Sequence, residues 1–169
     1  FLQMIGALKV LMPEVAVLAE VPAGSFQHHP EGSAFVHTMM VVDEISTLQS
    51  IKSNGDRELR IFAALVHDLG KGTTPAAMLP KHHGHEERGV GLVKEMCKRM
   101  KLPANYVKVG TLVAKYHTHV HNANVLNPKT FVTMWEDLKQ LEHLFIFNIF
   151  VHVSYNGFYF CPAIGTIYN

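Results

Sequence analysis

Residues 67–72 read His-Asp-Leu-Gly-Lys-Gly and follow the apolar run Ile-Phe-Ala-Ala-Leu-Val at 61–66. This arrangement predicts a helix that packs into a core and ends by presenting the imidazole of His67 and the carboxylate of Asp68. Imidazole and carboxylate together suit a divalent ion such as Mn, Ni, Zn or Mg. The ammonium of Lys71 suits a phosphate group as a point charge. The motif therefore predicts a divalent-metal site beside a phosphate-binding group.

Histidine is unusually frequent, with 12 among 169 residues. Four further histidines lie near the ends of apolar patterns and support the metal interpretation: His37, His85, His117 and His119. The simpler alternative for any one of them is a helix cap or a solvent-facing side chain. Because neighbours on a helix point about 100° apart, His67 and Asp68 reach one ion only if it lies between them, or the carboxylate bridges two ions.

The composition fits one globular domain, since 48% of residues are hydrophobic and 17% charged, which excludes a disordered chain. The net charge of +1 gives no overall basic field that would indicate nucleic-acid binding. Cys97 and Cys161 form no CxxC pair, so we expect a reducing, cytoplasmic setting. The apolar stretch 145–153 is interrupted by Asn148 and His152 and is too short to span a membrane. We also expect no signal peptide.

Apolar residues recur at helical spacing along most of the chain. A first helix is expected to begin after Ser33 as N-cap, with His37 at its start. Asn54-Gly55 is interpreted as a turn, with Asp56 capping the next helix. The core face of that helix is expected to comprise Leu59, Phe62, Ala63, Val66 and Leu69.

The segment 70–81 is rich in glycine and proline and is expected to be a loop. Further helices are expected from His85 to Met100, after Pro103, and after Asn127, where Pro128 suits the first helical position. No alternating strand pattern of useful length appears before the C-terminal tail. The fold class is therefore predicted to be all-α, a bundle of about six or more helices.

Several stretches resemble the HD-domain superfamily of metal-dependent phosphohydrolases. More narrowly, they resemble the C-terminal HD domains of bacterial CCA-adding tRNA nucleotidyltransferases. The most specific are FAALVHDLGKGTTP at 62–75 and LVAKYHTHVH at 112–121. The others are 6–15, 29–31, 36–41, 79–80, His82 and 84–86. The resemblance covers roughly residues 4–140 and implies a helical HD-domain bundle over 1–143.

The resemblance also implies roles for individual residues. His37, His67 and Asp68 match the superfamily's metal ligands, while His85 and His117 match histidines that complete the site or hold a second ion. Lys71 matches the lysine that contacts phosphate, so Asp68 and Lys71 are the implied catalytic pair. The implied substrate-binding residues at the rim of the site are Lys71, His82 and His119, and His121 also matches a family position.

The activities implied are those of a 2′,3′-cyclic phosphodiesterase, 2′-nucleotidase and phosphatase, supported by a divalent metal such as Ni, Mg, Mn or Co. The implied partners are tRNA or nucleotide phosphates and an N-terminal nucleotidyltransferase domain, with a homodimer as a further option and no membrane. The Gly-rich, carboxylate-bearing motif of that N-terminal domain is absent, so we expect no CCA addition by this chain alone.

Some positions depart from the family pattern. Superfamily members usually close the site with an Asp on a late helix, but the last carboxylate here is Glu142, and 150–156 reads Phe-Val-His-Val-Ser-Tyr-Asn. His152 is the nearest nitrogen ligand. Ser33 and Phe35 replace an Asp and a Gly of the family. The segment 144–169 no longer resembles the family and is interpreted as a divergent tail.

Two alternatives to the hydrolase stay open. One is an HD domain with a weakened site that positions tRNA or dimerises the parent protein. The basic residues Lys94, Lys98, Arg99 and Lys101, with Lys108 and Lys115, would then contact the tRNA backbone rather than form a solvated face. The other is a free-nucleotide hydrolase of the deoxynucleotidase or alarmone type, which shares the His-Asp core but not the GKGTTP and YHTHVH sequences.

Overall fold

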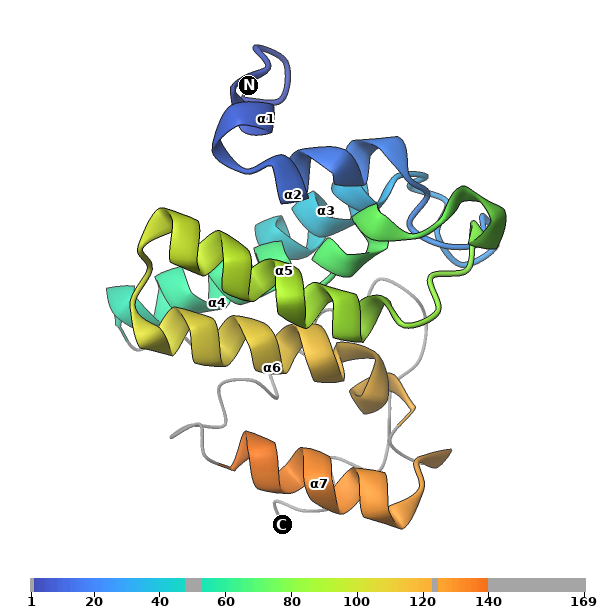
Figure 1. Cartoon of the computed structure of the whole chain (residues 1–169), viewed down its shortest axis with the longest axis vertical. Helices are drawn as coiled ribbons and strands as arrows, with labels where there is room; N and C mark the ends of the chain where they lie inside the picture. Colours follow the sequence, from blue (N-terminus) through green and yellow to red (C-terminus); the bar gives the residue numbers. More distant parts are fainter. Residues whose placement is uncertain (1, 48–52, 123–124, 140–169) are drawn as a thin grey trace.

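The computed structural model describes residues 2–47, 53–122 and 125–139, and these form an assembly of helices (Figure 1). The α-helices are α1 (Ala7–Leu11), α2 (Pro13–Ala16), α3 (Ala34–Thr47), α4 (Asn54–Val66), α5 (His85–Met100), α6 (Ala104–His121) and α7 (Pro128–Leu138). Three 3₁₀ turns join them: η1 (Val17–Glu20), η2 (Leu69–Thr73) and η3 (Ala76–Met78). Within these ranges there is no strand, only an isolated bridge between Pro22 and Ser33. The all-α prediction is confirmed.

The predicted helix starts are partly correct. The Ser33 hydroxyl accepts a hydrogen bond from the Val36 amide at 3.2 Å, and the Asn127 side chain accepts one from the Lys129 amide at 2.9 Å. The prediction that Asp56 caps α4 is wrong, because Ser53 adopts an extended backbone and its hydroxyl accepts from the Asp56 amide. Asn54-Gly55 therefore lies in the first helical turn instead of a separate turn.

Helix α4 contributes to both apolar clusters of the core. Phe62 and Val66 pack into one apolar cluster with Leu8, Leu18, Leu69, Val93 and Met96. Ala63 and Ala64 pack into a second cluster with Val41, Ile45, Val113 and Tyr116. Figure 1 shows α5 and α6 side by side along one side of the bundle, with α7 beyond α6. The predicted core face is confirmed for Phe62, Ala63 and Val66, while Leu59 is only half-buried and Leu69 is buried in η2, beyond the end of the helix.

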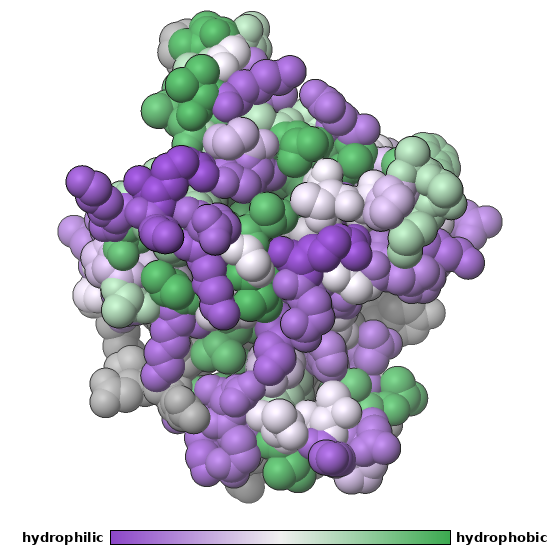
Figure 2. All heavy atoms as spheres, viewed as in Figure 1, coloured by the Kyte–Doolittle hydropathy of each residue, from purple (hydrophilic) through white to green (hydrophobic). Residues whose placement is uncertain are grey.

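The surface is mixed, and Figure 2 shows hydrophobic side chains gathered at the end formed by α1. There Met4 and Val10 are almost fully exposed. Lys94, Lys98 and Lys101 are exposed on and just after α5. None of the helices in the described ranges is both long enough and apolar enough to cross a lipid bilayer.

The predicted loop 70–81 is largely ordered into η2 and η3, and η2 lies against the start of α5. A Cβ on Gly70 would fall 1.9 Å from the His85 carbonyl oxygen and 2.7 Å from the Gly89 amide nitrogen. Glycine is therefore required here for close backbone approach. This contact lies beside the place where Asp68 approaches His85, with Oδ1 and Nε2 3.5 Å apart.

We expect Gly70→Ala to destabilise the fold by about 1–3 kcal/mol or more, because the backbones of η2 and α5 must separate to admit the methyl group. Thermal unfolding followed by circular dichroism measures the loss. Gly91→Ala is the matched control: it lies in α5 with open space around its Cα, so it should be neutral or stabilising by up to about 1 kcal/mol. Equal melting temperatures for the two variants would contradict the close packing.

Candidate metal centre

His67 and Asp68 lie where α4 ends. His67 is the C-cap of the helix with helical backbone angles, and Asp68 leaves the helical conformation at φ −109° and ψ 12°. Both side chains are buried, at 1% exposure each. The prediction that this pair ends a buried helix is confirmed. A carboxylate removed from water to this degree needs compensating positive charge or hydrogen bonds.

Three other elements bring a buried histidine to the same place. His37 lies in the first turn of α3, His85 is the first residue of α5, and His117 lies near the end of α6. The rings of His37 and His117 lie 5.7 and 5.4 Å from that of His67, centroid to centroid. The structure thus brings together the five residues for which the sequence predicts metal ligation: His37, His67, Asp68, His85 and His117.

Each of the four imidazoles has its Nδ1 atom committed to an acceptor. His67 Nδ1 donates to the Ala64 carbonyl at 2.7 Å, and His85 Nδ1 to the His82 carbonyl at 2.7 Å. His117 Nδ1 donates to the Ala114 carbonyl at 3.0 Å, and His37 Nδ1 to the Glu31 carboxylate at 2.7 Å. Since a neutral ring carries one N–H, the hydrogen-bond network assigns a lone pair to every Nε2 atom.

The Nε2 atoms of three of these histidines lie near Asp68, one beside Oδ2 and two beside Oδ1. Oδ2 lies 3.1 Å from His67 Nε2. Oδ1 lies 3.2 Å from His117 Nε2 and 3.5 Å from His85 Nε2. Two groups of potential ligands result, and in each the ligand atoms lie within 4.8 Å of one another: His37, His67 and Asp68 in the first, and Asp68, His85 and His117 in the second.

The chemistry of this donor set fits divalent cations. His67 Nε2 and Asp68 Oδ1 are buried and have no hydrogen-bond partner. The Nε2 atoms of His85 and His117 lie 3.0 Å apart. If both rings are neutral and carry their proton on Nδ1, neither Nε2 atom can donate a hydrogen bond to the other. A buried cluster of acceptors is unfavourable alone, whereas cations between them would satisfy every lone pair. Metal-bound histidines commonly donate their other N–H to a carbonyl or carboxylate, as all four do here.

The ionisation of the cluster favours the same conclusion. Burial alone would raise the pKa of Asp68, but the Lys71 ammonium and the neighbouring imidazoles hold it well below its usual range. Burial lowers the pKa of His117. Burial, reinforced by the neighbouring His67, lowers the pKa of His37 to about 4. At neutral pH, Asp68 is therefore an anion, and His37 and His117 are neutral, which are the forms that bind metals.

Lys71 lies inside the site. Its ammonium is 2.8 Å from Asp68 Oδ2 and donates a hydrogen bond to the Ala23 carbonyl at 2.8 Å. The side chain is 9% exposed. Asp68 therefore already has one cationic partner. An anionic group that enters the site would meet the ammonium of Lys71 in a fixed position.

The remaining predicted residues are placed differently. His82 is held by Thr74 Oγ1 and the Pro22 carbonyl, both at 2.8 Å, and its own carbonyl accepts from His85. The backbone of His82 thus fixes the orientation of the His85 ring. His119 packs edge-on against Tyr116 at 5.6 Å, and its position two residues after His117 turns it about 200° from that ligand. The structure does not bring His119 to the cluster, and the side chain of His121 lies outside the described residues.

The sequence interpretation gave no role to Glu31 and His29, although the HPE stretch at 29–31 was among the matching segments. Glu31 contacts His37 directly, and His29 contacts Glu31 at 2.8 Å. Arg88 was also missed: it donates to Thr73 and Thr74 at 3.0 Å each and ties the η2 segment to α5. The predictions for Glu142, His152 and the tail 144–169 concern residues outside the described ranges.

Comparison with known proteins places the chain among related sequences. The model of the HD domain family matches residues 29–146. The chain is 45% identical to the Multifunctional CCA protein of Thioalkalivibrio sulfidiphilus over 133 residues, which cover 79% of the chain and 31% of that relative. It is 41% identical to that of Pasteurella multocida over 137 residues, covering 81% and 32%. The chain thus spans about a third of the length of these relatives. No solved structure matches it.

The lowered histidine pKa values predict acid sensitivity of the metal-free protein. The unfolded chain binds a proton at His37 near pH 6.5, but the folded one only near pH 4. The contribution to stability is therefore complete above about pH 6.5 and is lost as pH falls toward 4, by roughly 3 kcal/mol for this residue. Chemical denaturation in the presence of a chelator, repeated across this pH range, measures the slope.

The slope should flatten in His37→Gln and stay as in wild type in His28→Gln, because His28 is exposed. A free energy of unfolding that is flat between pH 6.5 and 4 would contradict a buried, neutral His37.

Proposed function

The chain belongs to the HD domain family, a family of metal-dependent hydrolases, and from this premise we propose that it hydrolyses phosphate esters at a centre of two divalent ions. We propose 2′,3′-cyclic phosphodiesters, 2′-nucleotides and phosphomonoesters as substrates, at the 3′ ends of RNA or tRNA. The observation that carries the proposal is the convergence of the Nε2 atoms of His67, His85 and His117 on the two oxygens of the buried Asp68 carboxylate, with His37 grouped beside His67.

In this proposal His37, His67 and Asp68 would hold one ion, and Asp68, His85 and His117 would hold the other. Asp68 is the residue common to both groups. When bound, such ions lower the pKa of water to about 7 and neutralise charge on a phosphoryl oxygen. The identity of the metal, among Ni, Mg, Mn and Co, is a matter for experiment, because imidazole and carboxylate donors accept several of them.

Lys71 supplies the charge that binds substrate. An ammonium has three N–H donors, and Asp68 and the Ala23 carbonyl account for two of them. The third can be offered to a phosphate oxygen without breaking either contact. Because the ammonium is held in place and largely removed from water, its attraction for a phosphoryl group is stronger than that of an exposed lysine.

The matched relatives extend this proposal beyond the chain. They are named Multifunctional CCA proteins and are about three times longer than the matched region. We propose that this chain acts beside an N-terminal nucleotidyltransferase domain, with tRNA as the shared substrate, and that it adds no CCA alone. The exposed lysines on and after α5 are the proposed contact with the tRNA backbone. A homodimer of the parent protein is compatible with this arrangement.

Replacing Asp68, the residue common to both groups of potential ligands, tests the metal centre. Asp68→Ala should abolish hydrolysis and lower the metal content, because imidazoles alone hold the ions less well than imidazoles with an anion. His117→Ala should retain about one ion instead of two. Elemental analysis gives the metal content, and bis-p-nitrophenyl phosphate and 2′,3′-cyclic AMP, assayed with several metals, give the rates. An Asp68→Ala protein with full metal and rate would refute the assignment, and a metal-free wild type that still binds tRNA would favour the tRNA-positioning alternative.

Removing the ammonium separates substrate binding from metal binding. Lys71→Ala should reduce kcat/KM by roughly 10- to 1000-fold, about 1.4–4 kcal/mol of lost charge stabilisation. The metal content should not fall, since Lys71 competes with a cation for Asp68 Oδ2 rather than supporting it. Lys81→Ala is the control, because Lys81 is exposed in the same segment. An unchanged kcat/KM in Lys71→Ala would exclude a role in binding phosphate.

A further inference from the structure

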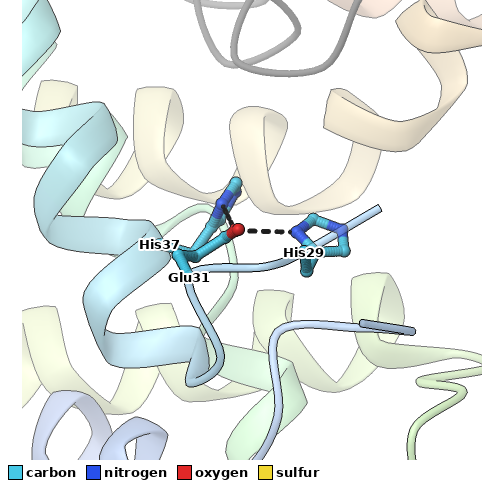
Figure 3. A group of neighbouring side chains, drawn as sticks. All are labelled: His29, Glu31 and His37. Atoms are coloured by element: carbon cyan, nitrogen blue, oxygen red, sulfur yellow. Dashed lines mark hydrogen bonds and ion pairs between the residues drawn. The ribbon is translucent and has the colours of Figure 1, made fainter. Parts of the chain in front are cut away.

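Three side chains that precede or begin α3 form a hydrogen-bonded group beside the metal centre. Figure 3 shows Glu31 between the rings of His29 and His37. Its Oε1 atom accepts from His37 Nδ1 at 2.7 Å and from His29 Nδ1 at 2.8 Å. The side chains of Glu31 and His37 are only 12% and 10% exposed, and that of His29 is 27% exposed. One largely buried carboxylate oxygen thus accepts hydrogen bonds from two imidazoles.

His37 differs from the other three histidines in what fixes its ring. His67, His85 and His117 each donate from Nδ1 to a carbonyl three residues earlier in their own segment. His37 lies at the start of α3, and its Nδ1 atom bonds to a side chain six residues away instead. Glu31 therefore performs for His37 what the backbone performs for the others.

We propose that Glu31 is a positioning residue of the metal centre, which keeps the proton of His37 on Nδ1 and its Nε2 lone pair toward His67 and Asp68. The inference rests on the proposed metal-dependent function. An anionic acceptor on the far side of a ligating imidazole fixes its tautomer and orientation and increases its basicity. Removal of such a partner typically weakens metal binding by roughly 10- to 100-fold.

His29 holds Glu31 in turn. Its ring lies edge-on to that of His37, with centroids 5.0 Å apart. It also packs on the backbone of Gly24, where an added Cβ would lie 2.4 Å from His29 Cδ2. Gly24→Ala would therefore displace His29 and remove one donor from Glu31 while leaving both Glu31 and His37 in the chain. This variant therefore tests the contribution of His29 to the position of Glu31 without removing the Glu31 carboxylate.

The same three residues could instead bind an ion themselves, since their ligand atoms lie within 4.8 Å of one another. That arrangement requires His37 Nδ1 to lose its proton, and a neutral ring would then carry the proton on Nε2. His37 could no longer ligate an ion beside His67 and Asp68. The two arrangements therefore exclude each other and are distinguished by the tautomer of His37.

The experiment compares Glu31→Ala, Glu31→Gln and Gly24→Ala with wild type, and uses Glu95→Ala as the control because Glu95 is exposed on α5. The affinity for Ni²⁺ is measured by competition with a chromophoric chelator. The tautomer of His37 in the metal-free protein is read from ¹⁵N chemical shifts of the imidazole. Glu31→Ala should weaken binding by roughly 10- to 100-fold and lose the Nδ1–H form.

Glu31→Gln should fall between wild type and Glu31→Ala, because an amide oxygen still accepts the hydrogen bond without the charge. Gly24→Ala should show a smaller loss of affinity, and Glu95→Ala none. An unchanged affinity and tautomer in Glu31→Ala would overturn the inference and leave the proposed function standing. An Nε2–H form of His37 in wild type would overturn the inference and also remove His37 from the proposed metal ligands. A wild-type protein that binds no divalent ion would overturn the proposed function and the inference with it.

Discussion

The buried carboxylate of Asp68 is the constraint on which the rest of the site depends. An anion removed from water must be balanced, and Lys71 does this only in part, because it contacts one oxygen of the two. The other oxygen faces lone pairs on His85 and His117. Such an arrangement raises the free energy of the folded protein unless cations lie between the acceptors. We therefore propose that the site binds divalent metal.

The fold produces this cluster of histidines around Asp68 because four segments of the chain meet at the site. The end of α4 supplies the carboxylate and one histidine, and α3, α5 and α6 supply one histidine each. The contact between η2 and α5 at Gly70 sets the spacing between the two potential ion sites, because it joins the carboxylate to His85. For His67 and His117 a carbonyl of the helix itself accepts from Nδ1 and fixes the ring, and for His85 the His82 carbonyl just before α5 does so.

Helical periodicity predicted much of this arrangement from sequence. The apolar spacing from Leu59 to Leu69 located the buried helix and placed His67 and Asp68 at its end. The cap of α4 was mispredicted because Ser53 and Asp56 both suit that position, and only backbone conformation decides between them. Glu31 escaped prediction because the segment around it has no periodic pattern, and its contact with His37 depends on how the chain folds back. His119 was predicted to bind substrate at the rim of the site, yet its helical phase turns it away from His117.

X-ray absorption at the metal edge of Ni²⁺-loaded protein tests the metal centre most directly. We expect clear imidazole scattering, with about two histidines and one carboxylate around each ion, and a reduction of this scattering in His37→Gln. An environment of oxygen ligands alone would show that the ion binds elsewhere and would contradict the claim that the four histidines around Asp68 form a metal centre.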